Sequence, residues 1–359
     1  MGDKIKVGIL GMGRAGDGMH TREMSLFKDK FELAAVCDID AARAEDMGKK
    51  HSCAFYSDIK EFLASKKMEL VVVATFSLDH LKNVEQALEA GYSVIAEKPL
   101  ALNYADGKHY LELDAKYPGK LFCRQNRRFE AAFQHVTEIL ASGILGDIHT
   151  IKLRRNGFNR RNDWQVLKKN GGGQLNNWGP HLIDHALQFL NYEVASVWGE
   201  LKRVAAMGDA DDSVKILLRN GKGLTVDIEI FGGAALPSNT YEIYGSRGAL
   251  FVDSAEQDIK MRYIDPEYKL KPYPIIEGHP NGFAFSDNAD LPWIRKTIMV
   301  KPASGLHVNS FYGVLYDTMR NGKPFPITAK QAVEVIRITE EIRKQNPQPG
   351  DRLRPSLQA

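Results

Sequence analysis

The chain has 359 residues, of which 43% are hydrophobic, and carries a formal net charge of +3 at pH 7. This length predicts two domains, and the small charge without a long basic run argues against a nucleic-acid-binding protein. The three cysteines form no Cys-x-x-Cys pair and no apolar run approaches membrane-spanning length. We therefore expect a cytoplasmic protein without a disulfide framework or a membrane span.

A glycine motif follows directly on the first predicted strand. The apolar residues of segment 5–10 run into Gly11-x-Gly13-x-x-Gly16, and a helix is predicted over residues 19–28. In a dinucleotide-binding fold such glycines allow the turn, the close approach of a pyrophosphate and the packing of helix on strand. The helix N-terminus also attracts phosphates. We therefore predict that the cofactor is bound by Gly11, Met12, Gly13, Arg14, Ala15 and Gly16.

The second predicted strand, residues 31–37, ends on Asp38. A dinucleotide fold places an acid about 20 residues after its glycine motif, where the acid binds the adenosine ribose hydroxyls. The carboxylate of Asp38 would repel a 2′-phosphate, so we expect NAD rather than NADP. Arg43 lies close in sequence and would offset part of this repulsion, which assigns it to the cofactor site as well. The alternative is a glycine turn followed by an unrelated surface aspartate.

Strands and helices alternate through the first third of the chain. Residues 70–75 form a continuous apolar run, as expected for a strand buried on both faces of a parallel sheet. Two more strands are predicted over 94–96 and 121–124, and two more helices over 103–117 and from residue 81 to a C-terminal glycine, Gly91. This alternation predicts a doubly wound parallel sheet of the Rossmann type, with a dinucleotide-binding domain over residues 1–124.

The pattern changes after residue 125. Strands with short turns dominate and predict a large mixed or antiparallel sheet with helices on one face. Helices are predicted over 133–141, 180–190 and 334–344, and strands over 148–156, 195–204, 213–219, 224–231, 240–244 and 249–253. Residues 264–305 are rich in proline and predicted to be irregular. A large open sheet would leave an apolar face in water, so we expect the α+β domain 125–359 to bind the substrate and to form a homodimer or homotetramer.

Two segments carry the candidate chemistry. Lys98, within Glu97-Lys98-Pro99, follows a strand at the sheet edge where α/β folds bind ligands. There a lysine can hydrogen-bond a substrate oxygen beside a nicotinamide and stabilise its negative charge during hydride transfer. His181 begins a helix behind the glycine run 171–173 and could exchange protons near neutral pH, and Asn177 could face the same pocket. Taken alone, each could instead be a surface or structural residue.

Two further patterns stay open. His181, Asp184 and His185 are three potential metal ligands on neighbouring helical positions, and histidines one turn apart can share a metal. The same side chains could equally cap, pair or pack, and we predict no metal. The arginine pairs at 154–155 and 160–161 could bind an acidic sugar or could be solvated.

Taken together, the chain resembles the Gfo/Idh/MocA family of NAD(P)-dependent oxidoreductases, which act largely on sugars, polyols and their derivatives. The likeness spans nearly the whole chain and rests on the glycine motif, Glu97-Lys98-Pro99, Arg127-Arg128-Phe129, the glycine run with His181, and Tyr244-Gly245-Ser246-Arg247-Gly248. It implies that Lys98 is the active-site lysine and His181 the proton-exchanging histidine. It also assigns nicotinamide contacts to Thr75, Phe76, His80, Glu97 and Lys98, and substrate contacts to Lys98, Arg127, Asn156, Trp164, Asn177 and His181.

One departure from the family pattern concerns the acid–base group. Many members carry an aspartate where this chain has Asn177, and an amide cannot stabilise a protonated imidazole by charge. The expected activity is hydride transfer to or from a carbinol carbon of a sugar, polyol or derivative. The enzyme could run mainly as a ketone reductase, or Asp184 could support His181. An NAD-dependent redox-assisted glycosidase and a non-catalytic dinucleotide-binding regulator are the alternatives, and the sequence names neither the sugar nor the reaction direction.

Overall fold

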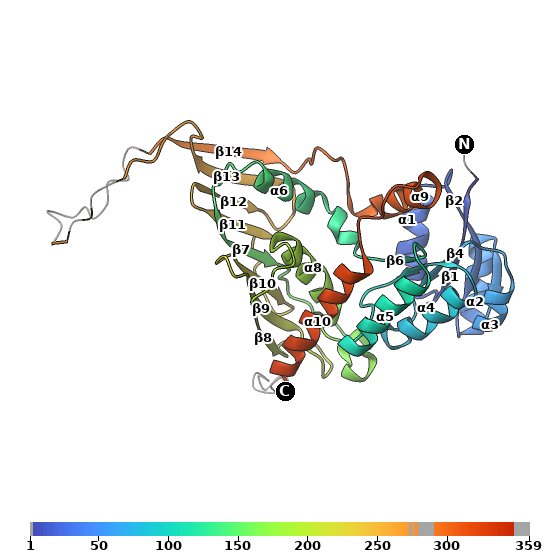
Figure 1. The fold of residues 1–359 in the computed structure, drawn as a ribbon. Coiled ribbons are helices and arrows are strands. Elements are labelled where there is room, and N and C mark those ends of the chain that lie inside the picture. Colours follow the sequence, from blue (N-terminus) through green and yellow to red (C-terminus); the bar gives the residue numbers. More distant parts are fainter. Residues whose placement is uncertain (1–2, 273–274, 276, 279–290, 348–359) are drawn as a thin grey trace.

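The structure is a computed structural model that describes residues 3–272, 275, 277–278 and 291–347. Two β-sheets lie side by side, and the end of the chain returns from the second sheet toward the helices of the first (Figure 1). The predicted fold class is confirmed: a parallel sheet comes first and a separate, mostly antiparallel sheet with helices follows. Within the described ranges, no helix has the length and apolar character needed to cross a membrane.

The first sheet has six parallel strands in the order β3-β2-β1-β4-β5-β6. Its strands are β1 (Ile5–Leu10), β2 (Phe31–Cys37), β3 (Ala54–Tyr56), β4 (Leu70–Val73), β5 (Ser93–Ala96) and β6 (Leu121–Cys123). Its helices include α2 (Ala41–His51), α3 (Ile59–Ala64), α4 (His80–Glu89) and α5 (Tyr104–Lys116). Every residue of β4 is fully buried, which explains why this strand is a continuous apolar run. The elements α2, β3 and α3 have no counterpart among the predicted elements.

The helix predicted over residues 19–28 begins earlier, at the last glycine of the motif. It starts as a π-helical turn, Gly16–Thr21, and continues as α1 (Arg22–Ser25). An added Cβ on Gly16 would lie 2.1 Å from the carbonyl oxygen of Gly11, so only glycine allows the helix to begin directly against β1. At Gly13, by contrast, a Cβ would meet nothing within 4 Å, and the motif is open on this side.

The second sheet has eight strands in the order β14-β13-β12-β11-β7-β10-β9-β8. Neighbouring strands are antiparallel except for the parallel pair β7 and β10, so the sheet is mixed. The strands are β7 (Ile148–Arg154), β8 (Ser196–Lys202), β9 (Ser213–Arg219), β10 (Thr225–Phe231), β11 (Tyr241–Gly245), β12 (Gly248–Val252), β13 (Asp258–Ile264) and β14 (Trp293–Met299). The helices α6 (Ala131–Ala141), α8 (Gly179–Phe189) and α10 (Ala329–Gln345) lie on one face of this sheet (Figure 1).

The segment 264–305, predicted to be irregular, contains the edge strand β14, and this expectation was wrong for that part. Most side chains of β14 are exposed, and they include the neighbouring charges Arg295 and Lys296. Charged edge strands discourage pairing with other chains, but they lack the apolar alternation by which a half-buried strand is recognised. Residues 273–274, 276 and 279–290 lie outside the described part.

The last two helices join the two sheets. Helix α9 (Phe311–Asn321), which was not predicted, buries Phe311, Tyr312 and Leu315 in the core of the first sheet. Helix α10 contributes side chains to the cores of both sheets. The domain boundary at residue 124 stays a prediction. It falls between the two sheets, but α9 and α10, which follow it in the chain, also pack in the core of the first sheet.

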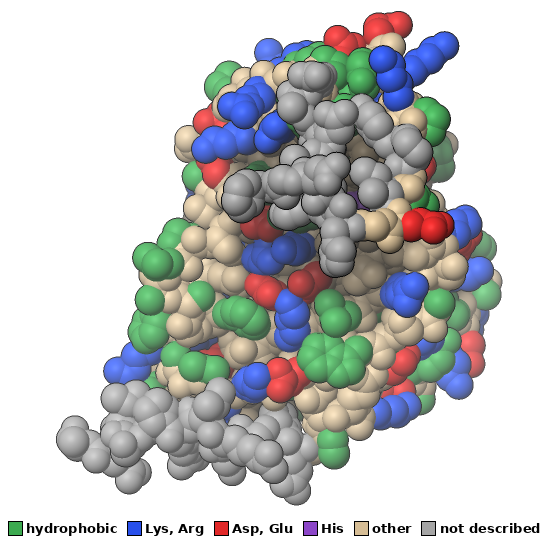
Figure 2. All heavy atoms as spheres, turned by 90° about the vertical axis from the view of Figure 1, so that its left-hand side faces the viewer, with side chains coloured by type: hydrophobic (Ala, Val, Ile, Leu, Met, Phe, Trp, Pro, Cys, Tyr) green, Lys and Arg blue, Asp and Glu red, His purple; other side chains and the backbone are tan. Residues whose placement is uncertain are grey.

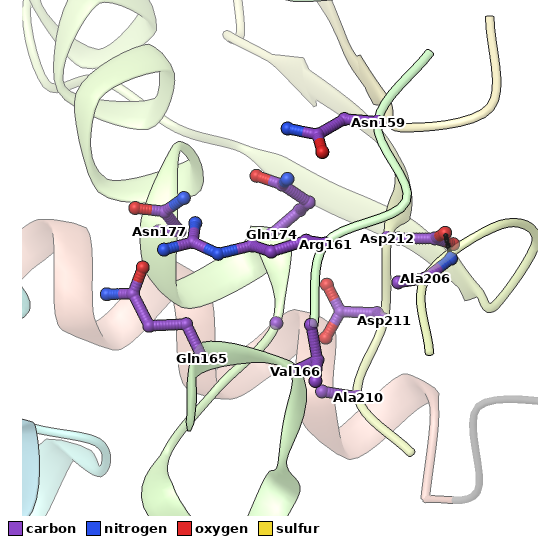
Figure 3. A pocket seen from close by; sticks show the side chains of 11 residues that line it. Asn159, Arg161, Gln165, Val166, Gln174, Asn177, Ala206, Ala210, Asp211 and Asp212 are labelled. Carbon is purple, nitrogen blue, oxygen red and sulfur yellow. Dashed lines mark hydrogen bonds between the residues drawn. The ribbon is translucent and has the colours of Figure 1, made fainter. Parts of the chain in front are cut away.

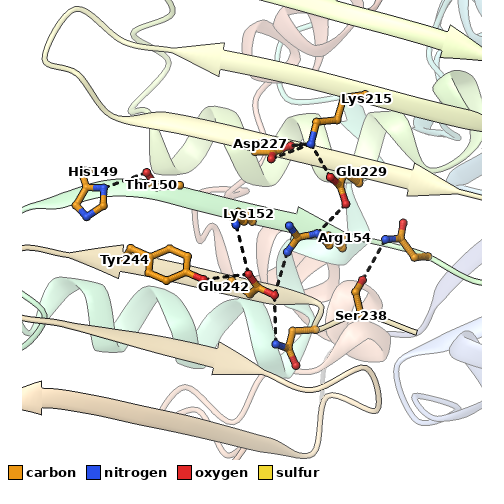
Figure 4. Close-up of polar contacts among 12 residues, drawn as sticks. His149, Thr150, Lys152, Arg154, Lys215, Asp227, Glu229, Ser238, Glu242 and Tyr244 are labelled. Atoms are coloured by element: carbon orange, nitrogen blue, oxygen red, sulfur yellow. Dashed lines mark hydrogen bonds and ion pairs between the residues drawn. The ribbon is translucent and has the colours of Figure 1, made fainter. Parts of the chain in front are cut away.

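The face of the second sheet that points away from the helices carries ion pairs. Lys215 bridges Asp227 (2.6 Å) and Glu229 (2.5 Å), and Glu229 also pairs with Arg154 at 2.8 Å (Figure 4). Basic and acidic side chains lie together in the middle of this face, with hydrophobic side chains around them (Figure 2). The face is therefore less apolar than expected. The homodimer or homotetramer and the cytoplasmic location stay predictions.

Replacing Gly16 with alanine is expected to destabilise the protein by about 2 kcal/mol or more, because the new Cβ would collide with the Gly11 backbone. Gly18→Ala is the matched control. Gly18 lies in the same helical turn, a Cβ there would meet nothing within 4 Å, and alanine favours helices by up to about 1 kcal/mol. Urea unfolding of both variants measures the difference, and equal unfolding free energies would contradict the close approach.

Candidate active site

Lys98 follows β5 at the carboxyl edge of the first sheet, and its side chain reaches a residue of the predicted domain 125–359. Its Nζ donates to the backbone oxygen of Asn177 (3.1 Å) and to the side-chain Oδ1 of the same residue (3.2 Å). Asn177 ends the short helix α7 (Gln174–Asn177), and His181 lies in the first turn of α8. Burial lowers the pKa of His181, and the charge of Lys98 lowers it further. The structure thus joins Lys98 with Asn177, and His181 lies in the first turn of the next helix after Asn177.

The backbone of Lys98 is anchored by the carboxylate of Glu97, whose Oε2 accepts from the Lys98 N–H at 2.9 Å. The other oxygen, Oε1, accepts from Arg124 NH1 at 2.9 Å and lies 3.1 Å from Nε2 of His20. Arg124 is 1% exposed, and its NH2 donates to Glu23 at 2.5 Å. Burial opposes ionisation of Glu97, but the charge of Arg124 and the His20 contact outweigh it and hold its pKa well below the usual range.

Burial lowers the pKa of Lys98 to about 8; the Glu97 carboxylate opposes this change, and the Arg127 charge adds to it. Burial and the Lys98 charge hold the pKa of His181 well below its usual range. The imidazole of His181 is therefore neutral at physiological pH. Its Nδ1 is buried and has no hydrogen-bond partner within the described protein, which leaves one polar atom free for a bound molecule.

The side-chain oxygen of Asn177 contacts Lys98, and its role beside His181 stays a prediction. Both oxygens of Asp184, the other residue considered as a support for His181, accept from Arg128, at 2.7 and 2.8 Å. His185 stacks on Phe133 with ring centroids 3.9 Å apart. Asp184 and His185 are thus engaged by different groups, and the described residues contain no cluster of three metal-ligand side chains.

On the cofactor side, the carboxylate of Asp38 is held by the glycine motif and its own turn. It accepts from Met12 N–H at 2.8 Å and from Asp40 N–H at 3.0 Å. The guanidinium of Arg43 lies 3.7 Å away. A fixed acid beside an open glycine motif fits a dinucleotide, whose ribose and pyrophosphate would lie against these two features.

The segment predicted to contact the nicotinamide is fixed by His80. Its ring nitrogens lie 2.8 Å from the Pro99 carbonyl oxygen and 3.0 Å from that of Thr75, so it joins the loops after β4 and β5. Phe76, which follows Thr75, is half exposed, and its ring meets that of Trp164 edge-to-face, with ring centroids 5.1 Å apart. This aromatic contact joins the loop after β4 to the predicted domain 125–359.

Two residues predicted to bind the substrate are engaged by protein groups. Arg127 lies over the ring of Trp178 at 4.2 Å and pairs with Glu130. Asn156 accepts from Phe231 N–H at 3.1 Å and donates to Ser238. The contacts of Asn156 hold β7 to β10, and none of its hydrogen bonds reaches Lys98 or His181.

A small pocket opens beside Asn177 (Figure 3), and the ≈ 300 Å³ of empty space measured over it includes open solvent. Its polar lining includes Gln174 and Asp211, neither of which was a sequence candidate. Arg124 of the Glu97 network was also missed, although a charged residue directly after the apolar strand β6 is a signal for the functional edge of a sheet. Asp211 gave no such signal, because it lies in a loop before β9.

Comparisons with known proteins agree with this architecture. Residues 5–124 match the model described as "Oxidoreductase family, NAD-binding Rossmann fold", and residues 133–251 match "GFO/IDH/MocA C-terminal domain". A solved NAD-binding protein from Listeria innocua has the same fold, with a TM-score of 0.79 and 23% identity over 96% of each chain.

Several curated relatives carry names that describe an activity, inositol dehydrogenases among them. A scyllo-inositol 2-dehydrogenase (NADP(+)), IolW of Bacillus subtilis, is 24% identical over 94% of this chain and 92% of its own length. A myo-inositol 2-dehydrogenase of Thermotoga maritima is 25% identical over 70% of this chain and 76% of its own length.

Arg124→Met should destabilise the protein by about 3–5 kcal/mol, because it leaves the buried carboxylates of Glu23 and Glu97 without their cation. The pKa of Glu97 is depressed in the folded state, so its stabilisation is present above the ordinary value of 4.5 and is lost as the pH falls below it. The Arg124→Met variant should therefore lose less of its unfolding free energy on acidification than the wild-type protein does. Denaturant titrations across pH measure both effects.

The control is Arg22→Met on α1, where the side chain is exposed and the expected change is within about 0.5 kcal/mol. An Arg124 variant as stable as this control would show that the buried pair does not hold the site together.

Proposed function

Because the chain belongs to the Gfo/Idh/MocA family of oxidoreductases, we propose that it transfers a hydride between a nicotinamide dinucleotide and a carbinol carbon of a sugar, polyol or sugar derivative. The observation that carries this proposal is the contact between Lys98 at the edge of the nucleotide-binding sheet and Asn177 on the helical segment of the second part. The dehydrogenase names of the relatives support this function over the glycosidase and the regulator.

We propose that Lys98 is the group that moves the proton. When bound, the nicotinamide supplies or accepts the hydride. In oxidation the neutral amine of Lys98 accepts the proton of the reacting hydroxyl, and in reduction the ammonium returns it. A pKa of about 8 suits both directions near neutral pH. Two neutral oxygens of Asn177 hold the Nζ without adding the negative charge that would raise this pKa.

His181 is proposed as the second catalytic residue. It is neutral, and its unpaired Nδ1 can accept a hydrogen bond from the reacting hydroxyl or from its neighbour on the substrate. This contact would orient the carbinol carbon while Lys98 exchanges the proton. Cationic groups around the site, including Arg127, favour the negative charge that develops on the substrate oxygen.

We further propose that NAD is preferred over NADP. The Asp38 carboxylate is buried and fixed by two backbone donors, and a 2′-phosphate would bring a second negative charge to it. The exposed Arg43 guanidinium is the group that would moderate this repulsion. The relative IolW is named for NADP(+), so membership of the family does not determine which dinucleotide is bound. The preference for NAD is therefore proposed for this chain alone.

Lys98→Met should lower kcat/KM by about 10³-fold, within the range for loss of a general acid–base, and leave NAD binding within threefold. In the wild-type protein, kcat/KM for oxidation should rise with pH and level off above about 8, because the neutral amine is the active form. In Asn177→Asp a carboxylate would face the Nζ, raise the Lys98 pKa and move this rise about one pH unit higher. Initial rates of NADH formation across pH measure both variants.

Asn176→Asp is the charge-matched control for this experiment. Its side-chain oxygen accepts from Arg343 at 2.7 Å, so the added charge is neutralised away from Lys98 and the profile should not move. Full activity of Lys98→Met would overturn the assignment of Lys98 as the proton-transferring group. So would a rise in kcat/KM that occurs at the same pH in Asn177→Asp as in the wild-type protein.

Asp38→Ser should keep an acceptor for the Met12 N–H while removing the charge, and NADPH should then bind at least about tenfold more tightly, equivalent to about 1.4 kcal/mol. Adding Arg43→Ala should cancel most of that gain, because Arg43 is then the cation nearest the 2′-phosphate. Fluorescence titrations with NADH and NADPH measure the affinities. Tighter binding of NADPH by the wild-type protein would refute the preference.

A further inference from the structure

Three of the four arginines that could have recognised an acidic sugar already pair with carboxylates. Arg154 pairs with Glu229 on the outer face of the second sheet, and Arg155 pairs with Glu130 at 3.0 Å. Arg161 is the arginine that lines the pocket beside Asn177, and it holds its neighbour Asp163 through two bonds of 2.7 Å. A substrate carboxylate would have to displace an existing carboxylate to reach any of these three guanidinium groups.

The pocket itself is lined by groups that suit hydroxyls. The carboxamides of Gln165 and Asn177 lie on one side and Asp211 lies across from them, with Gln174 and the side chain of Arg161 between (Figure 3). The side-chain oxygen of Gln174 is buried and has no hydrogen-bond partner in the described protein. A carboxamide both donates and accepts, so several of them can bind a neutral molecule with many hydroxyls and leave no charge unpaired.

Asp211 is held in a fixed position. Its Oδ2 accepts from Leu175 N–H at 2.8 Å, and its Oδ1 packs so closely on Gly173 that an added Cβ would lie 2.2 Å away. The last glycine of the run 171–173 therefore makes room for this carboxyl group. The carboxyl group of Asp211 points into the pocket (Figure 3), whereas its neighbour Asp212 points away and accepts from three backbone N–H groups at 204–206.

We propose that this pocket binds the uncharged, hydroxyl-bearing end of the substrate and that Asp211 is the residue that discriminates against anionic substrates such as sugar acids. The proposal rests on the proposed function for its location, because Asn177 both lines the pocket and contacts the Nζ of Lys98. A fixed carboxyl group accepts hydrogen bonds from two neighbouring hydroxyls of a polyol. Burial raises the pKa of Asp211 to about 6, so above that pH the group is ionised and repels a carboxylate or phosphate; like charges held together cost several kcal/mol.

The test uses the NAD-loaded full chain and matched pairs of neutral and acidic sugars: glucose with glucuronate, and galactose with galacturonate. For the wild-type protein, kcat/KM should favour the neutral sugar of a pair by about 100-fold or more. Asp211→Asn keeps an acceptor for the Leu175 N–H and should lower this ratio at least about tenfold, because the KM of the acid falls and the KM of the neutral sugar, which loses a charged acceptor, rises.

Asp209→Asn is the control. Its carboxylate accepts from Lys168 N–H and is not part of the pocket lining, so the ratio should not change. Equilibrium binding of the same sugars to the NADH-loaded Lys98→Met protein gives the discrimination without turnover. A wild-type protein that accepts the acid as well as the neutral sugar, or a ratio unchanged in Asp211→Asn, overturns the pocket assignment alone.

If the sugars bind with the expected discrimination but none is oxidised or reduced, the proposed hydride transfer fails and the pocket assignment stands. If no sugar of either kind binds or reacts, both proposals fall.

Discussion

The buried ion pair between Glu97 and Arg124 is the contact on which the rest of the site depends. It joins the ends of β5 and β6, and through His20 and Glu23 it also fixes the helix that begins at the glycine motif. Removing one partner of such a pair leaves an uncompensated buried charge, so the strand ends cannot move apart at low cost. The cofactor turn and the backbone of Lys98 are thereby held in one rigid frame.

The same arrangement sets the charge of the catalytic groups. The single carboxylate of Glu97 is shared between Arg124, His20 and the backbone of Lys98, so the Lys98 ammonium lacks a counter-charge of its own. Asn177 supplies oxygens and no charge. Burial, and after it the excess of positive charge, keeps His181 neutral and lowers the pKa of Lys98 to about 8. The same positive charge favours an anionic oxygen on the substrate.

The sequence predicted those elements whose pattern is local. The strands β2 and β9 match their predicted ranges because a buried parallel strand and an alternating hairpin strand each have a clear apolar pattern. The exposed edge strand β14 has no such pattern. Lys98 could be found because ligand sites occur where parallel strands end. Its contact with Asn177 joins residues 79 positions apart, and a local sequence pattern does not indicate contacts over such a distance. Asp211 was missed for the same reason, since it enters the site only through the space left by Gly173.

The return of the chain end to the first sheet has a consequence for synthesis on the ribosome. Phe31 of β2 packs edge-to-face on Tyr312 of α9, with ring centroids 5.1 Å apart, and His20 contacts the Tyr312 hydroxyl at 2.7 Å. The core of the first sheet therefore stays incomplete until residues 311–336 have been translated, and until then the apolar side chains that α9 and α10 cover are exposed on the nascent chain.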